Sequence, residues 1–425
     1  MSLQGSLASR KDCSGEGQIL PLNVILNICK STQQAALSSS LFVVLPDGDE
    51  YTGGIYKYND KEFILITERG KTNYSMELYP ELIWDENIEI KELIRLGISW
   101  QYLSLKVESL GYGVSQRARA PKKINKLINT NTTQNQVLLY SVAVRKCNRG
   151  ALIEDKSKPL QKELEEGTYL LDTPDCYKNR AIYENRYEGI SLDSTIFNRV
   201  EKKSPDFSSL YELSQLLWAC QGETDHTTHG NRDDLVKNGY GRVHASGCAG
   251  YSVYPLVFVN DLANISKGGY WYNPVGFSAL NRWVSVNDNL NYDHYIQEFT
   301  TDYFKTQIEE ELGREFSNYV ILLCIDRQKP CGAGFIHKVM NLKYWAEIEG
   351  GMALAGLQLQ ANALGLTWQK VILPNPDNVK YRSLFNLEFA EQSINNMATN
   401  LVNQAKNERL SLKSHLVPIV LFYLK

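Results

Sequence analysis

Cysteine and histidine are the residues that most often bind metals or act as nucleophiles, and here their spacing argues against both roles. The eight cysteines are scattered and no two form a CxxC pair, so neither a zinc site nor a disulfide framework is expected. His226 and His229 are three residues apart, but the Thr, Gly, Asn and Asp residues around them indicate a loop. The chain also lacks the GxGxxG, GxxxxGK[ST], HExxH and GxSxG motifs. We therefore expect no metal and set aside these catalytic classes.

The stretch from Ile348 to Leu366 is the most informative segment, because its small residues permit unusually close contacts. It reads as a buried helix with Gly365 as its C-cap. Glycine lowers helix propensity by roughly 1 kcal/mol per residue, so tight packing has to offset that loss. The partner in this packing is either a second helix or a flat ligand. The small residues are Gly350, Gly351, Ala353, Ala355, Gly356, Ala361 and Ala363.

Composition narrows the class of protein. With 425 residues the chain is long enough for two domains, and 43% hydrophobic residues can form substantial cores. A net charge of −3 argues against nucleic acid or an anionic membrane as the main partner. There is no run of 18 apolar residues and no signal-peptide pattern, so a cytoplasmic protein is expected.

Two stretches of the chain show the same features in the same order. The apolar run 41–44 precedes a glycine pair and an aromatic strand, 53–59, and the run 256–259 precedes a similar strand, 268–273. Both parts are 215 positions apart (256 against 41, 268 against 53). The sequence therefore suggests an internal repeat, with chance similarity of two αβ segments as the alternative.

Two glycine pairs extend this match to a long helix. Gly97 corresponds to Gly351 and Gly111 to Gly365, both at a spacing of 254 positions (351 against 97, 365 against 111). The larger spacing means that the first half is a shortened copy. The predicted division is a disordered leader (1–16), a degenerate first half (17–150), a charged linker (151–190) and a catalytic half (191–425).

With these features assembled, the second half resembles the nitroreductase superfamily of FMN flavoproteins. It is most similar to the azoline dehydrogenase branch (SagB/ThcOx type), whose members oxidise thiazoline and oxazoline rings in modified peptides. The resemblance covers about residues 195–425 and, more faintly, about 20–115. It depends on four segments taken in order: 213–222, 246–256, 268–273 and 348–366.

The fold implied by this resemblance is α+β, with a mixed, mostly antiparallel sheet flanked by helices. Such proteins are usually dimers with FMN at the subunit boundary. A tandem copy would form that pseudo-twofold boundary within one chain. A homodimer of the whole chain stays open, and the alternative for residues 17–150 is a peptide-binding clamp.

The resemblance implies a phosphate site in the segment from Arg199 to Lys203. The family usually has a basic residue at each end of this motif with a serine between them. Arg199 and Lys203 keep the two cations, which suit a phosphate group. Glu201 replaces the serine, and a carboxylate repels phosphate unless it points away.

Two further segments correspond to parts of the family that contact the flavin ring. The stretch from Arg242 through Ser246 and Gly247 resembles a Pro-Ser-Ala-Gly loop, in which small residues allow close approach. After the Gly-rich helix, a backbone N–H approaches flavin N5 in the family. The nearest positions here are Ile372 and Leu373, and neither is the usual glycine.

The resemblance also implies a lysine–tyrosine pair that removes a proton as hydride leaves the substrate. Lys343 and Tyr344 are the matching candidates, just before the Gly-rich helix. A desolvated lysine can act as a base near neutral pH. Adjacent residues of a helix do not share a face, so both would reach one substrate only at an irregular helix start. Glu349 is expected to hold a neighbouring helix or loop.

The sequence thus favours an FMN-dependent oxidoreductase acting on a thiazoline or oxazoline ring in a peptide or carrier-bound substrate. One alternative is an NAD(P)H-dependent nitro- or quinone-reductase. The other is a flavin-less scaffold or peptide-binding partner, which Glu201 and the absent glycine near position 373 would suit.

Overall fold

The structure is a computed structural model. It describes residues 3, 6, 7, 17–34, 41–59, 62–80, 89–117, 122–131, 141–146, 168–171, 190–197, 200, 202, 209–227, 240–244, 251–259, 262–265, 268–274, 279–282, 319–327, 345–373, 376, 377, 379–385, 387, 388, 390–395 and 415–424.

The first half forms an antiparallel sheet with the strand order β3-β2-β1-β4-β6-β5. The long helix α3 covers one face with α2, and α4 packs against the other face through Ile124 and Ile128. The elements are α2 (Leu22–Gln34), β1 (Leu41–Leu45), β2 (Gly54–Tyr58), β3 (Phe63–Thr67), β4 (Met76–Pro80), α3 (Ile90–Ser109), β5 (Tyr112–Arg117), α4 (Lys122–Asn131) and β6 (Ser141–Lys146).

The second half forms another antiparallel sheet, with the order β14-β15-β13-β10-β11-β12-β7. A separate hairpin pairs β8 with β9. The elements are β7 (Thr168–Leu170), α6 (Leu192–Ile196), α7 (Leu210–Gln221), β8 (Glu223–Thr227), β9 (Tyr240–Arg242), β10 (Val253–Val259), β11 (Gly268–Asn273), β12 (Ala279–Arg282), β13 (Tyr319–Ile325), α11 (Trp345–Ala363), β14 (Trp368–Ile372), α12 (Val379–Leu384) and β15 (Val417–Leu424).

Both halves present their main elements in the same order along the chain: a helix, four strands, a long helix, a strand, a short helix and a last strand. The sheet order corresponds as well, because β12-β11-β10-β13-β15-β14 repeats β3-β2-β1-β4-β6-β5 strand for strand. The second half differs by the added edge strand β7 in its sheet and by the separate β8–β9 hairpin. The two halves therefore share one topology.

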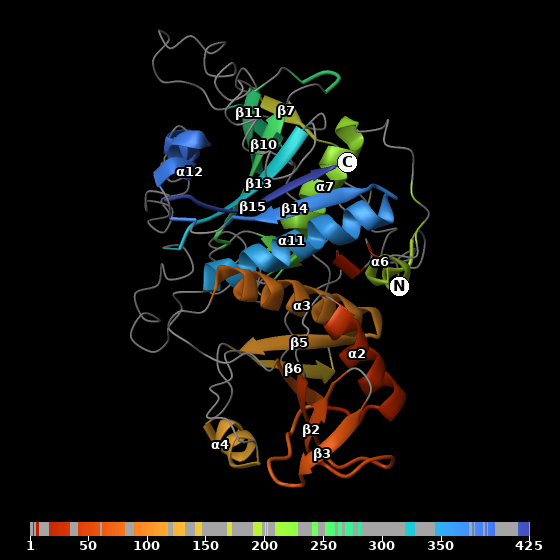
Figure 1. Cartoon of the computed structure of the whole chain (residues 1–425). Coiled ribbons are helices and arrows are strands. Elements are labelled where there is room, and N and C mark those ends of the chain that lie inside the picture. Colours follow the sequence, from red (N-terminus) through yellow and green to blue (C-terminus); the bar gives the residue numbers. More distant parts are fainter. Residues whose placement is uncertain are drawn as a thin grey trace.

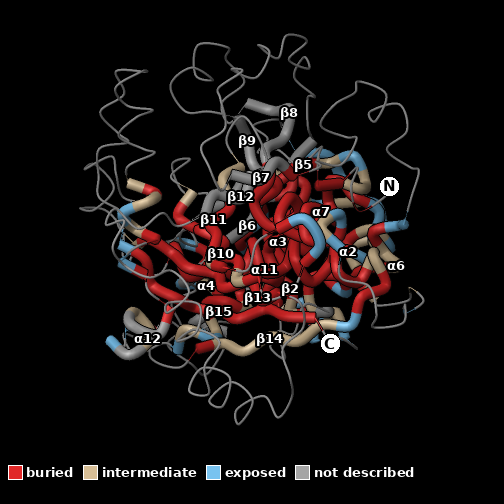
Figure 2. Tube along the Cα trace, turned by 90° about the horizontal axis from the view of Figure 1, so that it is seen from above, coloured by how far each residue is buried: buried red, intermediate tan, exposed pale blue. Residues whose placement is uncertain are grey.

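The two sheets lie at opposite ends of the molecule, with the long helices α3 and α11 between them (Figure 1). Seen from above, these helices form the buried centre (Figure 2). All of α11 from Trp345 to Asn362 is buried. Strands β10, β13 and β15 are almost wholly buried, since helices cover one face and the segment around α12 covers the other. This explains why these strands are continuously apolar rather than alternating.

The local signals for the predicted helices are visible in the structure. The Gly-rich helix is α11, and it ends as predicted, with Gly365 at φ 72° and Leu366 N–H donating to the carbonyl of Ala361. Helix α7 begins at a capping box, in which the side chains of Ser209 and Glu212 each accept a hydrogen bond from the other residue's backbone N–H.

The strand pairing corrects the predicted alignment of the halves by one residue. Leu45 pairs with Gly54 in the first sheet, and Val259 pairs with Gly268 in the second. These pairs correspond at a spacing of 214 positions (259 against 45, 268 against 54), not 215. The sequence did not reveal this one-residue shift, because it contains two adjacent glycines, Gly53 and Gly54, and only Gly54 begins β2.

Parts of the expected leader and linker are packed into the second half. Leu3 and Leu7 are buried in its core, and Leu3 N–H donates to the carbonyl of Ile190 at 3.0 Å. In the expected linker, β7 pairs with β12 at the edge of the second sheet. At these positions the chain is ordered by contacts that composition does not reveal.

Candidate functional site at the boundary of the two halves

The two long helices touch at a pair of glycines. A methyl group on Gly97 would overlap the carbonyl oxygen of Ile348, and one on Gly351 would overlap the carbonyl oxygen of Ile94. The contact is reciprocal, since Ile348 follows Ile94 by the same 254 positions that separate the glycines (348 against 94). Residues with corresponding places in the two halves thus meet as they do across a twofold axis.

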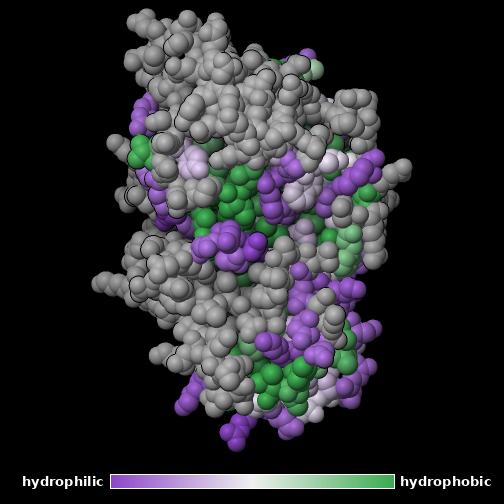
Figure 3. Space-filling view, in the orientation of Figure 1, coloured by the Kyte–Doolittle hydropathy of each residue, from purple (hydrophilic) through white to green (hydrophobic). Residues whose placement is uncertain are grey.

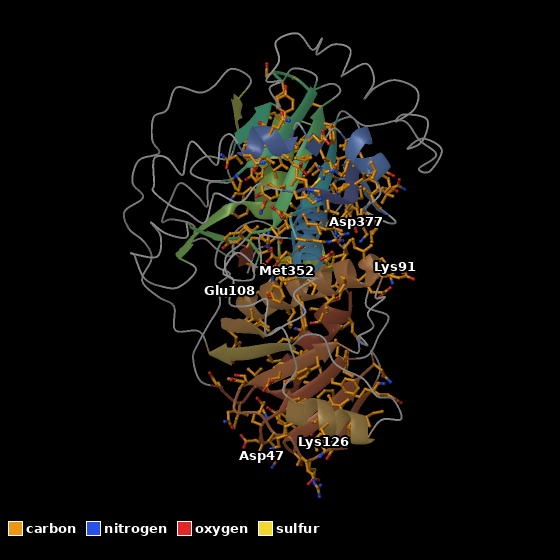
Figure 4. The ribbon with its side chains drawn as sticks, turned by 90° about the vertical axis from the view of Figure 1, so that its left-hand side faces the viewer. Asp47, Lys91, Glu108, Lys126, Met352 and Asp377 are labelled. Carbon is orange, nitrogen blue, oxygen red and sulfur yellow. The ribbon has the colours of Figure 1, made fainter. Side chains whose placement is uncertain are left out.

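The small residues of α11 serve helix packing on a second side. A methyl group on Gly356 would overlap the carbonyl oxygen of Ala219 in α7. Of the two partners that the sequence allowed, a helix is therefore the one found at both Gly351 and Gly356. Around the crossing the halves exchange side chains: Ile94 and Ile98 of α3 enter the second core, while Ile348 and Met352 enter the first. Figure 4 shows Met352 at this boundary.

Helix α6 connects the C-terminal parts of the two long helices. Lys106 of α3 donates to Asp193 at 2.7 Å, and the amide of Asn362 in α11 donates to the carbonyl of Thr195 at 3.2 Å. Lys106 is only 3% exposed, whereas the side chain of Asp193 is half exposed, so solvent reaches this ion pair from the side of the carboxylate. The segment with the predicted phosphate-binding residues follows α6 directly.

In that segment, Lys202 lies at the C-terminal end of α11. Its ammonium donates to the carbonyl of Leu366 at 3.2 Å, where a cation also suits the helix dipole. Partial burial lowers the pKa of Lys202. Arg199, Glu201 and Lys203 lie outside the described residues, so their predicted relation to phosphate stays a prediction.

The segment predicted to run against the flavin is held by both halves where it is described. Arg242 ends β9, and the N–H of the next residue, Val243, donates to the carbonyl of Gly222 at 3.1 Å. From the first half, the amide of Gln101 donates to the carbonyl of Val243 at 2.8 Å. Ser246 and Gly247 lie outside the described residues.

A buried carboxylate fixes the other end of this loop. Glu349 is fully buried and accepts hydrogen bonds from the backbone N–H and the hydroxyl of Ser252, at 3.0 and 2.5 Å, and from the indole of Trp345 at 2.6 Å. Ser252 immediately precedes β10. The prediction that Glu349 holds a neighbouring loop is confirmed.

Strand β14 is the accessible edge of the second sheet, because each of its residues is only partly buried. Ile372 pairs with Val420, and the N–H of Leu373 donates to the carbonyl of Ile419 at 2.9 Å. That N–H is therefore engaged within the sheet, and the approach of Ile372 or Leu373 to a flavin stays a prediction. Near the middle of the face in Figure 3, about where β14 and β15 lie in Figure 1, apolar side chains gather beside hydrophilic ones.

The first turn of α11 contains an ion network that the sequence did not indicate. Arg327 donates to Glu347 at 2.6 Å and to Asp377 at 2.6 Å. Glu347 is 2% exposed, and its second carboxylate oxygen has no hydrogen-bond partner among the described residues. Burial raises the pKa of Glu347, and Arg327 opposes the shift. Lys343 and Tyr344, which precede this turn, lie outside the described residues.

No cluster of potential metal ligands occurs in the part of the chain that the structure describes. His226 lies in strand β8, so the expected loop was wrong at this residue, while His229 lies outside the described part. Cys29, Cys220 and Cys324 are buried free thiols whose pKa is raised by burial. No described helix is both long and apolar enough to cross a membrane.

Comparison with solved structures identifies the architecture. A candidate nitroreductase from Anabaena variabilis matches with a TM-score of 0.50 and 10% identity, over 96% of this chain and 89% of its own. The chain has a nitroreductase-like fold. A candidate nitroreductase from Ralstonia eutropha (TM-score 0.34, 14% identity, 65% of this chain and 96% of its own) also matches. So does one chain of the E. coli microcin synthetase McbBCD complex (TM-score 0.31, 13% identity, 80% of this chain and 97% of that chain). No family model and no curated protein matches the sequence.

Proposed function

We propose that the protein is an FMN-dependent oxidoreductase whose two halves form one internal pseudo-dimer. The observation that carries this proposal is the reciprocal contact of Gly97 and Gly351 within a nitroreductase-like fold. The family resemblance places FMN at a subunit boundary, and here the equivalent boundary lies inside one chain. The common topology of the halves supports the tandem copy over the peptide-binding clamp for residues 17–150.

The described residues at the boundary fit a flat, polar ligand such as flavin. Gln101 holds the carbonyl of Val243 and Glu349 holds Ser252, so both described ends of the segment predicted to contact the flavin are fixed. The edge strand β14 is partly accessible beside apolar side chains, as a slot for a ring requires. Arg199, Arg242 and Lys203 would supply cations for the phosphate.

The finer proposal is dehydrogenation of a thiazoline or oxazoline ring in a peptide or carrier-bound substrate. When bound, FMN would supply the acceptor for a hydride, which carries both of the electrons that the ring loses. The protein would orient the ring carbon that loses hydride, and Lys343 or Tyr344 would remove the proton from the neighbouring carbon. The product would gain a carbon–carbon double bond and so become aromatic.

Reduction of the purified protein's flavin under anaerobic conditions tests this function against its main alternative. Bleaching of the flavin by a thiazoline-containing peptide, but not by NADH or NADPH, is the expected result. Bleaching by NAD(P)H alone would instead indicate a nitro- or quinone-reductase. A protein that takes up no flavin would exclude both enzymes and leave the scaffold, with which the engaged N–H of Leu373 agrees.

A further inference from the structure

Strand β3 is the outer strand of the first sheet, and among the described strands it pairs with β2 alone. Its sequence, Phe-Ile-Leu-Ile-Thr, contains neither a charged residue nor a proline, the features that usually protect an edge strand. Ile64 is 47% exposed and Leu65 is 39% exposed. Apolar side chains gather among hydrophilic ones at the lower end of Figure 3, about where β2 and β3 lie in Figure 1. The outer edge of β3 is therefore an apolar surface on which another strand could pair.

Contacts with β2 and with the turn between the two strands hold β3 in place. The ring of Phe63 stacks on that of Tyr56, with the centroids 4.4 Å apart. In the turn, the N–H of Asn59 donates to the carbonyl of Glu62 at 3.2 Å, and the N–H of Glu62 donates to the side-chain oxygen of Asn59 at 2.9 Å. The edge is thus extended before any partner arrives, which lowers the entropy that the protein loses on binding.

The second half shows what covers the equivalent edge of this fold. Strand β12 holds the place of β3 in the second sheet, and β7 pairs with the outer side of β12 in antiparallel orientation. Strand β7 precedes α7, the helix with which the repeated topology begins, so the added strand comes from outside that topology. The outer edge of this sheet therefore accepts a strand from another segment of polypeptide.

The two edges differ in polarity at corresponding positions. Tyr56 of β2 corresponds to Tyr270 of β11 at the spacing of 214 positions (270 against 56) that the strand pairing gives. Leu65 pairs with Tyr56, and Arg282 pairs with Tyr270, so Leu65 and Arg282 hold the same place in the two sheets. The topology therefore does not require an apolar residue at this place, and the exposed leucine of the open edge indicates a partner.

We propose that the outer edge of β3 binds an extended, apolar segment of a partner protein, which adds to the sheet as an antiparallel strand. A second copy of this chain is disfavoured by charge. Two β3 strands paired about Leu65 would place Glu62 of each copy opposite Glu68 of the other, and both glutamates are exposed. The same two glutamates favour a segment with a basic residue on each side of its apolar centre. The surface lies away from the boundary of the halves (Figure 1), so it does not depend on flavin.

Fluorescence anisotropy of a labelled synthetic peptide tests this surface. The peptide has the centre Thr-Tyr-Leu-Leu-Thr between two lysines, and its first four central residues are those of positions 168–171. We expect saturable binding by the wild type, weakened at least about tenfold in Ile64→Lys and in Leu65→Lys, because each variant loses an apolar contact and repels the lysines of the peptide. Ile19→Lys is the matched control, because Ile19 is 51% exposed in the same half but lies outside the strands. Equal midpoints of urea unfolding establish that the variants are folded.

N-methylation of the peptide tests strand pairing with the protein unchanged. One edge of a strand uses the N–H groups of every second residue, so methylation of one alternate set should abolish binding and methylation of the other should not. Contact through apolar side chains alone would affect both peptides equally.

The proposal is overturned if the wild type does not bind the peptide, if the two methylated peptides bind equally, or if Ile19→Lys loses as much affinity as Leu65→Lys. A wild-type dimer that Leu65→Lys dissociates, and that does not bind the peptide, would also overturn it and identify a second copy as the occupant. None of these measurements requires FMN, so they decide this surface whether or not the proposed function holds.

Discussion

Gly97 of α3 and Gly351 of α11 lie against each other, and each faces the carbonyl oxygen three residues before the other. Such reciprocity is expected of an isologous interface between two copies of one fold. Here it occurs within one chain and brings the main-chain atoms of the two helices into direct contact. The boundary between the halves is therefore a rigid, shared core rather than a loose contact between domains.

Replacing either glycine with alanine should destabilise the protein by about 1–3 kcal/mol, the usual cost of overpacking. The methyl group would overlap a backbone carbonyl, which cannot move aside as a side chain can. This cost should exceed the roughly 1 kcal/mol that alanine contributes as a better helix former. Urea unfolding of Gly97→Ala and Gly351→Ala measures the effect.

The double variant is the control for this prediction. Both methyl groups would separate the same two helices. The destabilisation of the double variant should therefore be smaller than the sum of the destabilisations of the two single variants. Single variants as stable as the wild type would show that the helices do not touch at these glycines.

Loss of the Glu349 carboxylate should be among the most damaging single changes. Glu349→Ala leaves buried N–H and O–H donors of Ser252 and Trp345 without an acceptor, at a cost of roughly 3 kcal/mol or more. Ser252→Ala removes only one hydroxyl donor and should cost about 1 kcal/mol. Midpoints of urea unfolding should fall in that order, and a Ser252→Ala variant as unstable as Glu349→Ala would contradict the contact.

Stability should depend on pH through Glu347. Its pKa is raised in the folded state, so the folded protein binds its proton more tightly than the unfolded chain does. The resulting stabilisation is complete below the ordinary value of 4.5 and is lost as pH rises through the folded-state pKa. Glu347→Gln removes this dependence.

The free energy of unfolding, measured from pH 4 upwards, checks this prediction. The difference between Glu347→Gln and the wild type should move in favour of the variant as pH increases. Glutamine retains an oxygen that can accept from Arg327, so the packing of the first turn of α11 is preserved. A difference that does not change with pH would show that burial does not control this carboxyl group.

The sequence predicted those elements that have strong local signals. The glycine and alanine content of α11, with Gly365 beyond its end, predicted a buried helix in close contact with a second helix or a flat ligand, and helices are what it contacts. The strands at 41–44, 53–59, 256–259 and 268–273 were also predicted, because short apolar or aromatic runs beside glycine are typical of strands. Gly97 and Gly351, which the sequence aligned at a spacing of 254 positions, are the residues that meet where the two long helices cross.

Contacts between distant residues could not be predicted in this way. Arg327, Glu347 and Asp377 are far apart in the sequence, and nothing in their local patterns distinguishes them from surface charges. Strand β7 is short and is held at the edge of the sheet by pairing with β12. Its amino-acid composition alone does not distinguish it from a linker.

The visible absorption spectrum of the purified protein, with FMN added and the excess removed, tests the central claim most directly. We expect the two absorption bands of oxidised flavin to stay with the protein, and to be lost in an Arg199→Ala/Lys203→Ala double variant that remains folded. A folded wild-type protein that remains colourless after exposure to FMN would contradict the account and leave a nitroreductase-like fold that serves as a scaffold.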